Sequence, residues 1–496
     1  MINRIKAGIQ KYEKLSTAAR TAMWIMICTV LQKGVSILTL PVFARIMTTT
    51  QYGQFTVYHS WQNILIIITT LRLNYAVFSK GMSKYSEDRD SYTCTMQLVT
   101  AAIAVICFAV YFLFNGFFTD LIGLPRLIIS AMFLELIVTP SISFWTIRKR
   151  YEFIYRPIVI RTLLMLFLNA ALGIVVVLLS TEKGYARILS AIAVHSFFGI
   201  MLFAVNLKAA KTKFVWEYAK FALLFNIPLI IHYLSLYVLD QFDKIMVQKM
   251  VSVEATAIYG MAYSAGMIVK IITQSLHQTM VPWQYNKLKR QQYTEIDNNL
   301  FLMLLAVSAA MICFSLCAPE LMLLLGGKKY AEARFLIAPV ALGMVFSFAF
   351  SFFASIEFYF DKNRFTMYIS MIAAGLNVLL NYIGIKMYGY SAAAWTTAIC
   401  YLVMSIGHYI YMERSLKKDG VDLQLKTKRL ILMTVLISIS TVGIVLLYPF
   451  VWIRYALFAL SVIILFIYRK RLISAFKVMR EAKRRPTEIE TEQISQ

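Results

Sequence analysis

The sequence predicts an all-α polytopic membrane protein with about 14 transmembrane helices. Apolar segments of about 20 residues follow one another from about residue 21 to about residue 468, and each is long enough to cross a bilayer. Hydrophobic residues make up 59% of the chain and charged residues 15%, which leaves too little polar surface for a water-soluble globule of 496 residues. Because lipid offers no hydrogen-bond partners to the backbone, segments this long and apolar are expected to be helices.

Lys and Arg concentrate in every second gap between the apolar segments, and this alternation sets the orientation. The gaps on the side of the N-terminal segment hold about 35 basic residues and the other gaps about 11. Typical clusters on the rich side are Arg148 to Arg150 and the tail from Arg469 to Arg485. The positive-inside rule assigns this side to the cytoplasm, so both termini of this multi-pass chain are expected there.

The net charge of +25 has another common explanation, a soluble protein that binds nucleic acid through clustered cations. Here the cations are separated by apolar segments, as in loops between spanning helices, and no basic domain is present in the sequence. A nucleic-acid partner is therefore not expected.

The gaps assigned to the outside are all short, so no extracytoplasmic domain is expected to carry a site. The sequence shows no paired-carboxylate set, Ser/His/Asp constellation, metal-ligand spacing or phosphate-binding Gly-rich loop. The six cysteines lie in or beside apolar segments without a CxxC pair, which favours a packing role. We therefore expect neither an enzyme, such as a glycan polymerase or ligase, nor a cofactor or metal.

An internal repeat relates segments one to six to segments seven to twelve at an offset of about 206 residues. The pairs are "ARIMTTTQYGQF" with "DKIMVQKMVSVEATAIYG", "LNAALG" with "LNVLLN", and "GYARILSAIAVHS" with "GYSAAAWTTAICY". An even number of spans in each copy predicts two six-helix bundles related by a parallel pseudo-twofold axis. The expected domains are bundles at 1–211 and 212–412, appended helices 13 and 14 at 413–468, and a cytoplasmic tail at 469–496.

Three stretches resemble a known family. They are "LPVFARIMTTTQYGQF" from Leu40, "IPLIIHYLSLYVLDQFDKIMVQKMVSVEATAIYGMAYSAGMI" from Ile227 and "LNVLLNYIGIKMYGYSAAAWTTAICYL" from Leu376. They look like the polysaccharide transport branch of the multidrug/oligosaccharidyl-lipid/polysaccharide exporter superfamily. The turn at Tyr388 to Ser391 departs from the Gly-x-x-Gly run that is common there.

The resemblance implies a flippase in the bacterial inner membrane that works by alternating access. Its substrate would be an undecaprenyl-diphosphate-linked oligosaccharide used for capsule, O-antigen or exopolysaccharide assembly. The implied partners are this lipid-linked oligosaccharide, membrane lipids and, as a candidate, a glycan polymerase.

Four cations fall inside predicted spans, where charge is costly and marks a functional candidate. Lys33 and Lys270 lie near the middle of their segments, whereas Arg72 and Arg161 lie within about two turns of the cytoplasmic end and can reach water. Because a diphosphate is anionic, we expect these four residues to bind substrate.

Two polar residues share a helix face with Lys270. Gln274 and His277 follow it at helical spacing, and such a stripe is expected to face water or another helix. Both are added to the predicted substrate site.

Glu135 is the carboxylate most clearly within a predicted span, which makes it a candidate ion-coupling residue or the partner of a cavity cation. Two other functions stay open. A multidrug antiporter shares the fold but favours carboxylates and aromatic faces for organic cations. A flippase for the peptidoglycan lipid precursor handles a similar headgroup, so charge alone does not exclude it.

Overall fold

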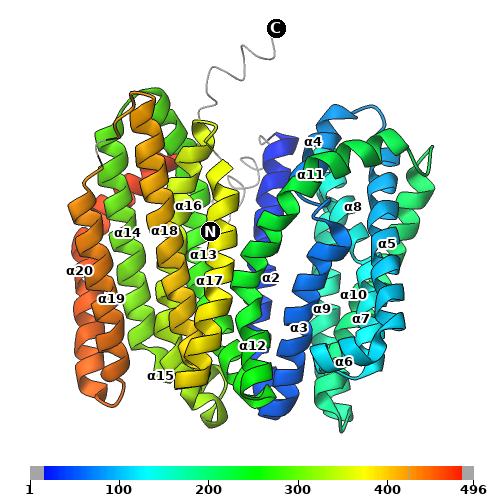
Figure 1. Cartoon of the computed structure of the whole chain (residues 1–496), viewed down its shortest axis with the longest axis horizontal. Helices are drawn as coiled ribbons and strands as arrows, with labels where there is room; N and C mark the ends of the chain where they lie inside the picture. The colour runs from blue at the N-terminus through cyan, green and yellow to red at the C-terminus, as the bar shows by residue number, and fades with distance from the viewer. Residues whose placement is uncertain (1–15, 363, 424, 483–496) are drawn as a thin grey trace, which may run out of the picture. The chain divides into compact units, whose positions relative to one another are not determined.

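The computed structural model describes residues 16–362, 364–423 and 425–482, and every regular element in these ranges is a helix (Figure 1). By length and composition, 12 of the described helices can cross a membrane, or up to 13 if one bent pair forms a single span. The protein is therefore an all-helical, multi-pass membrane protein.

The number of candidate spans is smaller than the 14 expected. One difference is α3 (Thr49–Thr70), which has 22 residues but does not count as a candidate span. Its glutamines, asparagine and histidine lower its hydropathy, and part of this polarity is used within the protein, as in the capping box between Thr48 and Gln51.

Contacts divide the chain into two compact units, Met1–Tyr237 and Val238–Gln496. In the first unit α11 packs against α3, α4 and α5. The helices of this unit, in order, are α2 (Thr17–Ile46), α3, α4 (Ala76–Lys84), α5 (Arg89–Leu113), α6 (Asn115–Ile122), α7 (Arg126–Val138), α8 (Pro140–Tyr151), α9 (Arg156–Leu179), α10 (Lys183–Ala209) and α11 (Trp216–Tyr237).

The second unit opens with a short π-helix that runs directly into α12 and includes the long helix α13. Its elements are η1 (Val238–Phe242), α12 (Asp243–Met250), α13 (Val253–Lys289), α14 (Tyr293–Leu316), α15 (Ala318–Leu325), η2 (Lys328–Ala333), α16 (Arg334–Tyr359), α17 (Arg364–Tyr388), α18 (Ala392–Lys418), α19 (Thr427–Leu446) and α20 (Val451–Ala482).

Helix α10 is the centre of the first unit, because it packs against α3, α5, α7, α8 and α9. Small residues allow this close approach: a Cβ on Gly199 would lie 3.0 Å from the backbone carbon of Val138. The Ser141 hydroxyl donates a hydrogen bond of 2.8 Å to the carbonyl of Gly199 across the same contact. Pro140 begins α8 directly after α7, and the two helices together make one candidate span.

In the second unit α16 packs against both α13 and α18, and α20 packs against α14 (Figure 1). A charged clamp fixes the start of α20: Arg454, which is buried, donates to both carboxylate oxygens of Glu320 at 2.8 and 3.0 Å and to the carbonyl of Leu316 at 2.7 Å. The hydrogen bonds from Arg454 lower the pKa of Glu320, which lies outside the candidate spans.

The ends of the chain are described only in part. The expected cytoplasmic tail from 469 is described to Ala482, as a continuation of α20. The basic residues before position 16 and the tail from 483 onward lie outside the described residues.

The contact of Gly199 with α7 yields a stability prediction. Gly199→Ala forces a methyl group against the Val138 backbone and is expected to destabilise the protein by about 1 to 3 kcal/mol. Gly443→Ala is the matched control, since a Cβ there meets nothing within 4 Å and alanine favours the helix. Thermal unfolding of the purified proteins in detergent measures both, and an unchanged melting temperature for Gly199→Ala contradicts the packing.

Candidate functional site

Two adjoining cavities lie in the first unit and share Gln32 and Thr162 in their lining. Their volumes are about 200 Å³ and about 330 Å³. Besides the shared pair, the polar lining of the first consists of Ser36, Thr39, Asn169, Arg187 and His195. That of the second includes Thr29, Asn74, Thr146, Arg150 and Arg161. The helices α2, α8, α9 and α10 thus surround a polar space that carries several cations.

Arg161 lines the second cavity, as its position within a predicted span suggested. Its Nη2 donates to the hydroxyls of Thr146 at 2.8 Å and Thr162 at 3.2 Å, and its guanidinium lies 5.6 Å from the centre of the Trp145 ring. The Nε of Arg161 is buried without a hydrogen-bond partner among the described residues. The side chain therefore keeps one buried donor that no described residue uses.

Arg187 lines the first cavity and was missed by the sequence analysis. Its Nη1 donates to the Asn169 side-chain oxygen at 2.9 Å, and its guanidinium lies 4.4 and 5.1 Å from the ring centres of Phe43 and Phe55. Its Nε is also buried and unpaired among the described residues. Arg187 lies only two residues after a short gap that is assigned to the outside. Its position in the sequence is therefore typical of a cation in a loop. The apolar run directly after it was the available signal that it lies within a helix.

Glu135 is almost fully buried on α7 and accepts hydrogen bonds from two other helices. The Tyr58 hydroxyl of α3 donates to one carboxylate oxygen, and Nδ1 of His195 on α10 lies 2.8 Å from the other. On its far side, Nε2 of His195 lies 3.1 Å from the Asn169 side-chain nitrogen. Glu135 thus has Tyr58 and His195 as its direct partners, and a chain of hydrogen bonds joins it to Arg187.

The other two predicted cations of the first unit lie elsewhere. Lys33 is exposed on α2, and the lining of the two cavities includes its neighbour Gln32. Arg72 follows α3 in the left-handed backbone region, with a φ of 54°. Its guanidinium lies 4.8, 5.5 and 5.4 Å from the ring centres of Tyr75, Tyr233 and Tyr237.

The predicted polar stripe of α13 is divided by its contacts. Lys270 forms an ion pair of 2.8 Å with Asp240 of η1, a partner that the sequence alone does not indicate. His277 contacts the carbonyl of Ser351 on α16 at 2.9 Å, whereas Gln274 is exposed. These three residues therefore have different environments within their unit.

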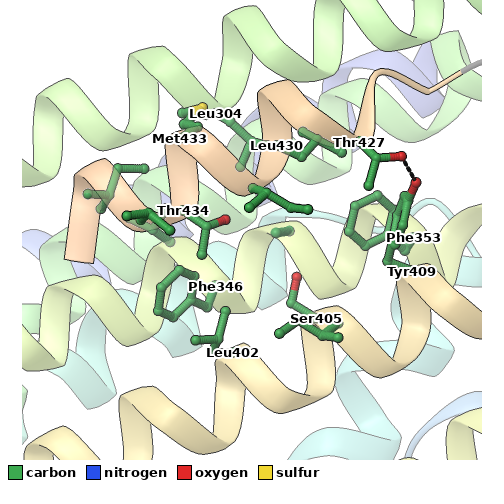
Figure 2. A pocket seen from close by; sticks show the side chains of 16 residues that line it. Leu304, Phe346, Phe353, Leu402, Ser405, Tyr409, Thr427, Leu430, Met433 and Thr434 are labelled. Atoms are coloured by element: carbon green, nitrogen blue, oxygen red, sulfur yellow. Dashed lines mark hydrogen bonds between the residues drawn. The ribbon is translucent and has the colours of Figure 1, made fainter. Parts of the chain in front are cut away.

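A third cavity, of about 330 Å³, lies among α14, α16, α18 and α19 in the second unit (Figure 2). Its lining is mainly aliphatic and aromatic, as Leu304, Phe346 and Leu430 illustrate. Two of its polar groups, the hydroxyls of Tyr409 and Thr427, hydrogen-bond to each other at 2.5 Å (Figure 2). The described lining residues of this cavity carry no charge, so they offer no ionic contact to an anionic group.

The fold and the cavities define a polytopic helical membrane protein with polar, cationic cavities, and comparison with known families identifies its family. The model of the family described as "Polysaccharide biosynthesis protein" matches residues 18–286, more than half of the chain, and the "MatE" model matches residues 228–383. The chain belongs to the polysaccharide biosynthesis protein family of the MOP superfamily, which consists of transporters and not enzymes.

Sequence identity to individual relatives is low. The chain is 27% identical over 201 residues to "Lsg locus putative protein 1" of Haemophilus influenzae, and the match covers 39% of this chain and 49% of that protein, so it spans about half of the relative. The fold is similar to that of the lipid II flippase MurJ in an inward closed conformation, with a TM-score of 0.64, 14% identity, and coverage of 90% of this chain and 99% of that one. It is also similar to an inward-facing multidrug resistance MATE family transporter, with a TM-score of 0.57, 13% identity, and coverage of 78% and 96%.

The ion pair of α13 yields a second prediction. Lys270→Ala removes the ion-pair partner of Asp240, which keeps the hydrogen bond from Gln241 at 3.1 Å. The variant is expected to lower the free energy of unfolding by about 1 to 3 kcal/mol, because a partly buried carboxylate loses this counter-ion. The double variant Lys270→Ala/Asp240→Asn is expected to recover most of this loss. Gln274→Ala, on the same helix but exposed, is the control. Equal stability of the single and double variants would argue against the pair.

Proposed function

We propose that this protein is a flippase that moves undecaprenyl-diphosphate-linked oligosaccharide repeat units across the bacterial inner membrane. The units serve the assembly of surface polysaccharide such as capsule, O-antigen or exopolysaccharide. Membership of a polysaccharide biosynthesis family of transporters supports a lipid-linked substrate. In this proposal the chain crosses the membrane with both termini in the cytoplasm, and a glycan polymerase is a candidate partner.

The observation that carries the proposal is the pair of arginines at the polar cavities of the first unit. Arg161 and Arg187 each keep a buried Nε donor without a partner among the described residues. A guanidinium offers paired donors that match phosphate oxygens, and a diphosphate presents several of them. Arg150, which lines the same cavity as Arg161, adds further positive charge.

The proposed substrate site keeps the residues expected from the sequence and gains one. Arg187 joins the set of Lys33, Arg72, Arg161, Lys270, Gln274 and His277, and Glu135 remains the candidate for ion coupling. Arg161 and Arg187 carry most weight, because both line cavities and both keep unused donors.

Transport is proposed to occur by alternating access of two six-helix bundles, 1–211 and 212–412, with helices 13 and 14 at 413–468 appended. Local geometry supports the repeat. The matched stretches align Asn169 with Asn377 and His195 with Cys400. Asn169 contacts His195 in the first unit, and the side chain of Asn377 interacts with that of Cys400 in the second. The same two positions therefore meet in both copies.

Two other functions are less well supported. Export of organic cations needs carboxylates that face a cavity, whereas the cavities of the first unit are lined by arginines and Glu135 is held by Tyr58 and His195. A flippase for the peptidoglycan lipid precursor remains the second candidate, because its substrate shares the diphosphate. Rescue of a host that lacks its polysaccharide flippase, compared with rescue of one that lacks its peptidoglycan-precursor flippase, separates the two.

The two arginines give the direct genetic test. Arg161→Ala and Arg187→Ala are each expected to reduce surface polysaccharide by about tenfold or more in a rescued deletion host, because each removes charge-assisted hydrogen bonds to the diphosphate. Arg45→Ala, which removes an arginine of α2 from a position outside the lining of both cavities, is the control. Immunoblotting of membranes checks protein level, and full export by both cavity variants would contradict the proposal.

The two lysines test the rest of the site. Lys33→Ala and Lys270→Ala are expected to abolish export while the protein stays in the membrane. The Lys270→Ala/Asp240→Asn variant separates stability from transport, because it is expected to restore the first and not the second. Normal export by both lysine variants removes these residues from the site and leaves the arginines as its binding groups.

A further inference from the structure

A directional chain of hydrogen bonds runs through the first unit from Arg187 to Glu135. Arg187 Nη1 donates to Asn169 Oδ1 at 2.9 Å, and Asn169 Nδ2 lies 3.1 Å from His195 Nε2. His195 Nδ1 lies 2.8 Å from Glu135, which also accepts from Tyr58. The chain begins at a cation that lines a cavity and ends at a buried carboxylate.

The chemistry of the groups fixes where each proton lies. A guanidinium only donates, so the Asn169 oxygen must face Arg187 and the Asn169 amino group must face His195. His195 Nε2 therefore accepts, which leaves the ring proton on Nδ1, where it is donated to Glu135. In this arrangement the imidazole is neutral, and the charges of Glu135 and Arg187 balance.

A second proton on the imidazole has a definite consequence. It occupies Nε2 and faces the Asn169 amino group, so two donors oppose each other. Rotation of the amide by half a turn relieves this contact but presents the amino group to Arg187. Nη1 has a second, more distant acceptor in the Ser190 hydroxyl, 3.5 Å away. The guanidinium thus loses its main side-chain acceptor and is free to reach into the cavity that it lines.

Exposure favours His195 over Glu135 as the group that takes up a proton from the cavity. His195 is partly exposed at the cavity, with 28% of its side chain accessible, whereas Glu135 is 1% accessible. From the packed helices, α7 contributes Glu135, α3 contributes Tyr58, and α5 places Cys107 and Tyr111 in the same core cluster. The lining from α2 and α9 consists of hydroxyl, amide and apolar side chains. Imidazole is the group that gains charge between about pH 8 and pH 5.

We propose that His195 is a proton-binding site that controls Arg187: protonation of Nε2 releases the guanidinium to bind an anionic phosphate headgroup in the adjoining cavity. The inference rests on the proposed function and adds a coupling between proton and substrate. Protonation raises the net charge of the cluster from zero to plus one, which favours an anion. By linkage, a bound anion raises the affinity of His195 for a proton by the same factor.

Binding of a short polyprenyl diphosphate to the full-length protein in lipid nanodiscs tests this coupling. The wild type is expected to bind about tenfold more tightly at about pH 5.5 than at about pH 8. Acid lowers the charge of the ligand's own phosphate, so a tighter complex at low pH cannot come from the ligand. Calorimetry at both pH values gives the two dissociation constants.

Three variants locate the effect. His195→Gln imitates the neutral imidazole, because its amide both donates to Glu135 and accepts from Asn169, and it is expected to bind weakly at both pH values. Asn169→Ala frees Arg187 permanently and is expected to bind at about pH 8 nearly as tightly as the wild type does in acid. His59→Gln, another histidine of the first unit that contacts an asparagine, Asn63, is expected to keep the wild-type pH dependence.

The outcomes distinguish this inference from the function on which it rests. Wild-type binding that is equal or weaker in acid, a pH response that survives in His195→Gln, or weak binding by Asn169→Ala at about pH 8 overturns the switch while the proposed function stands. Absence of polyprenyl diphosphate binding by the wild type and by Asn169→Ala at both pH values overturns the proposed function and the switch with it.

Discussion

An arginine inside the hydrocarbon core has to find hydrogen-bond acceptors or water, because its charge is costly in lipid and its guanidinium stays protonated. This constraint organises the first unit. Thr146 and Thr162 accept from Arg161, and Asn169 accepts from Arg187, while aromatic rings cover the guanidinium groups. These neutral partners hold each arginine in place without cancelling its charge. Among the described residues, neither guanidinium hydrogen-bonds directly to a carboxylate, and Glu135 balances the charge of Arg187 only through Asn169 and His195.

The packing of the helices holds these polar side chains in position. Helix α10 carries both Arg187 and His195 and contacts five other helices of its unit, so the two side chains are fixed relative to α7 and α9. Close approach at Gly199 and the hydrogen bond from Ser141 bring α10 against the junction of α7 and α8. In the second unit, by contrast, Lys270 is neutralised by Asp240, and the apolar cavity among α14, α16, α18 and α19 carries no charge in its described lining.

The sequence was sufficient for the class of protein and for part of the site. The bilayer requires apolar spans and favours cations on the cytoplasmic side. Helical spans could therefore be predicted from the residue types along the chain, without knowledge of contacts between helices. Arg161 and Glu135 were recognised because charge within an apolar run stands out. Arg187 was not, since its helix begins only four residues earlier, at Lys183, and position alone did not separate it from the loop. Asp240 as the partner of Lys270, and His195 as the partner of Glu135, depend on contacts between helices, which one sequence does not contain.

The number of spans also could not be predicted correctly without the contacts between helices. Helix α3 is polar for two reasons. Tyr58 donates a hydrogen bond to the buried Glu135 and accepts one from Gln62, and Thr48 and Gln51 form the cap of the helix. Composition alone therefore does not mark α3 as a spanning segment. Its role is visible only when the helices that it contacts are known. Polar residues within this unit therefore lower the hydropathy of a helix for a structural reason.

A structure of the protein determined with a short polyprenyl diphosphate in lipid nanodiscs tests the central claim most directly. The account predicts diphosphate oxygens within hydrogen-bond distance of Arg161 or Arg187, in the cavities that these residues line. A diphosphate bound away from both residues, with Arg161 still on Thr146 and Arg187 still on Asn169, would contradict it.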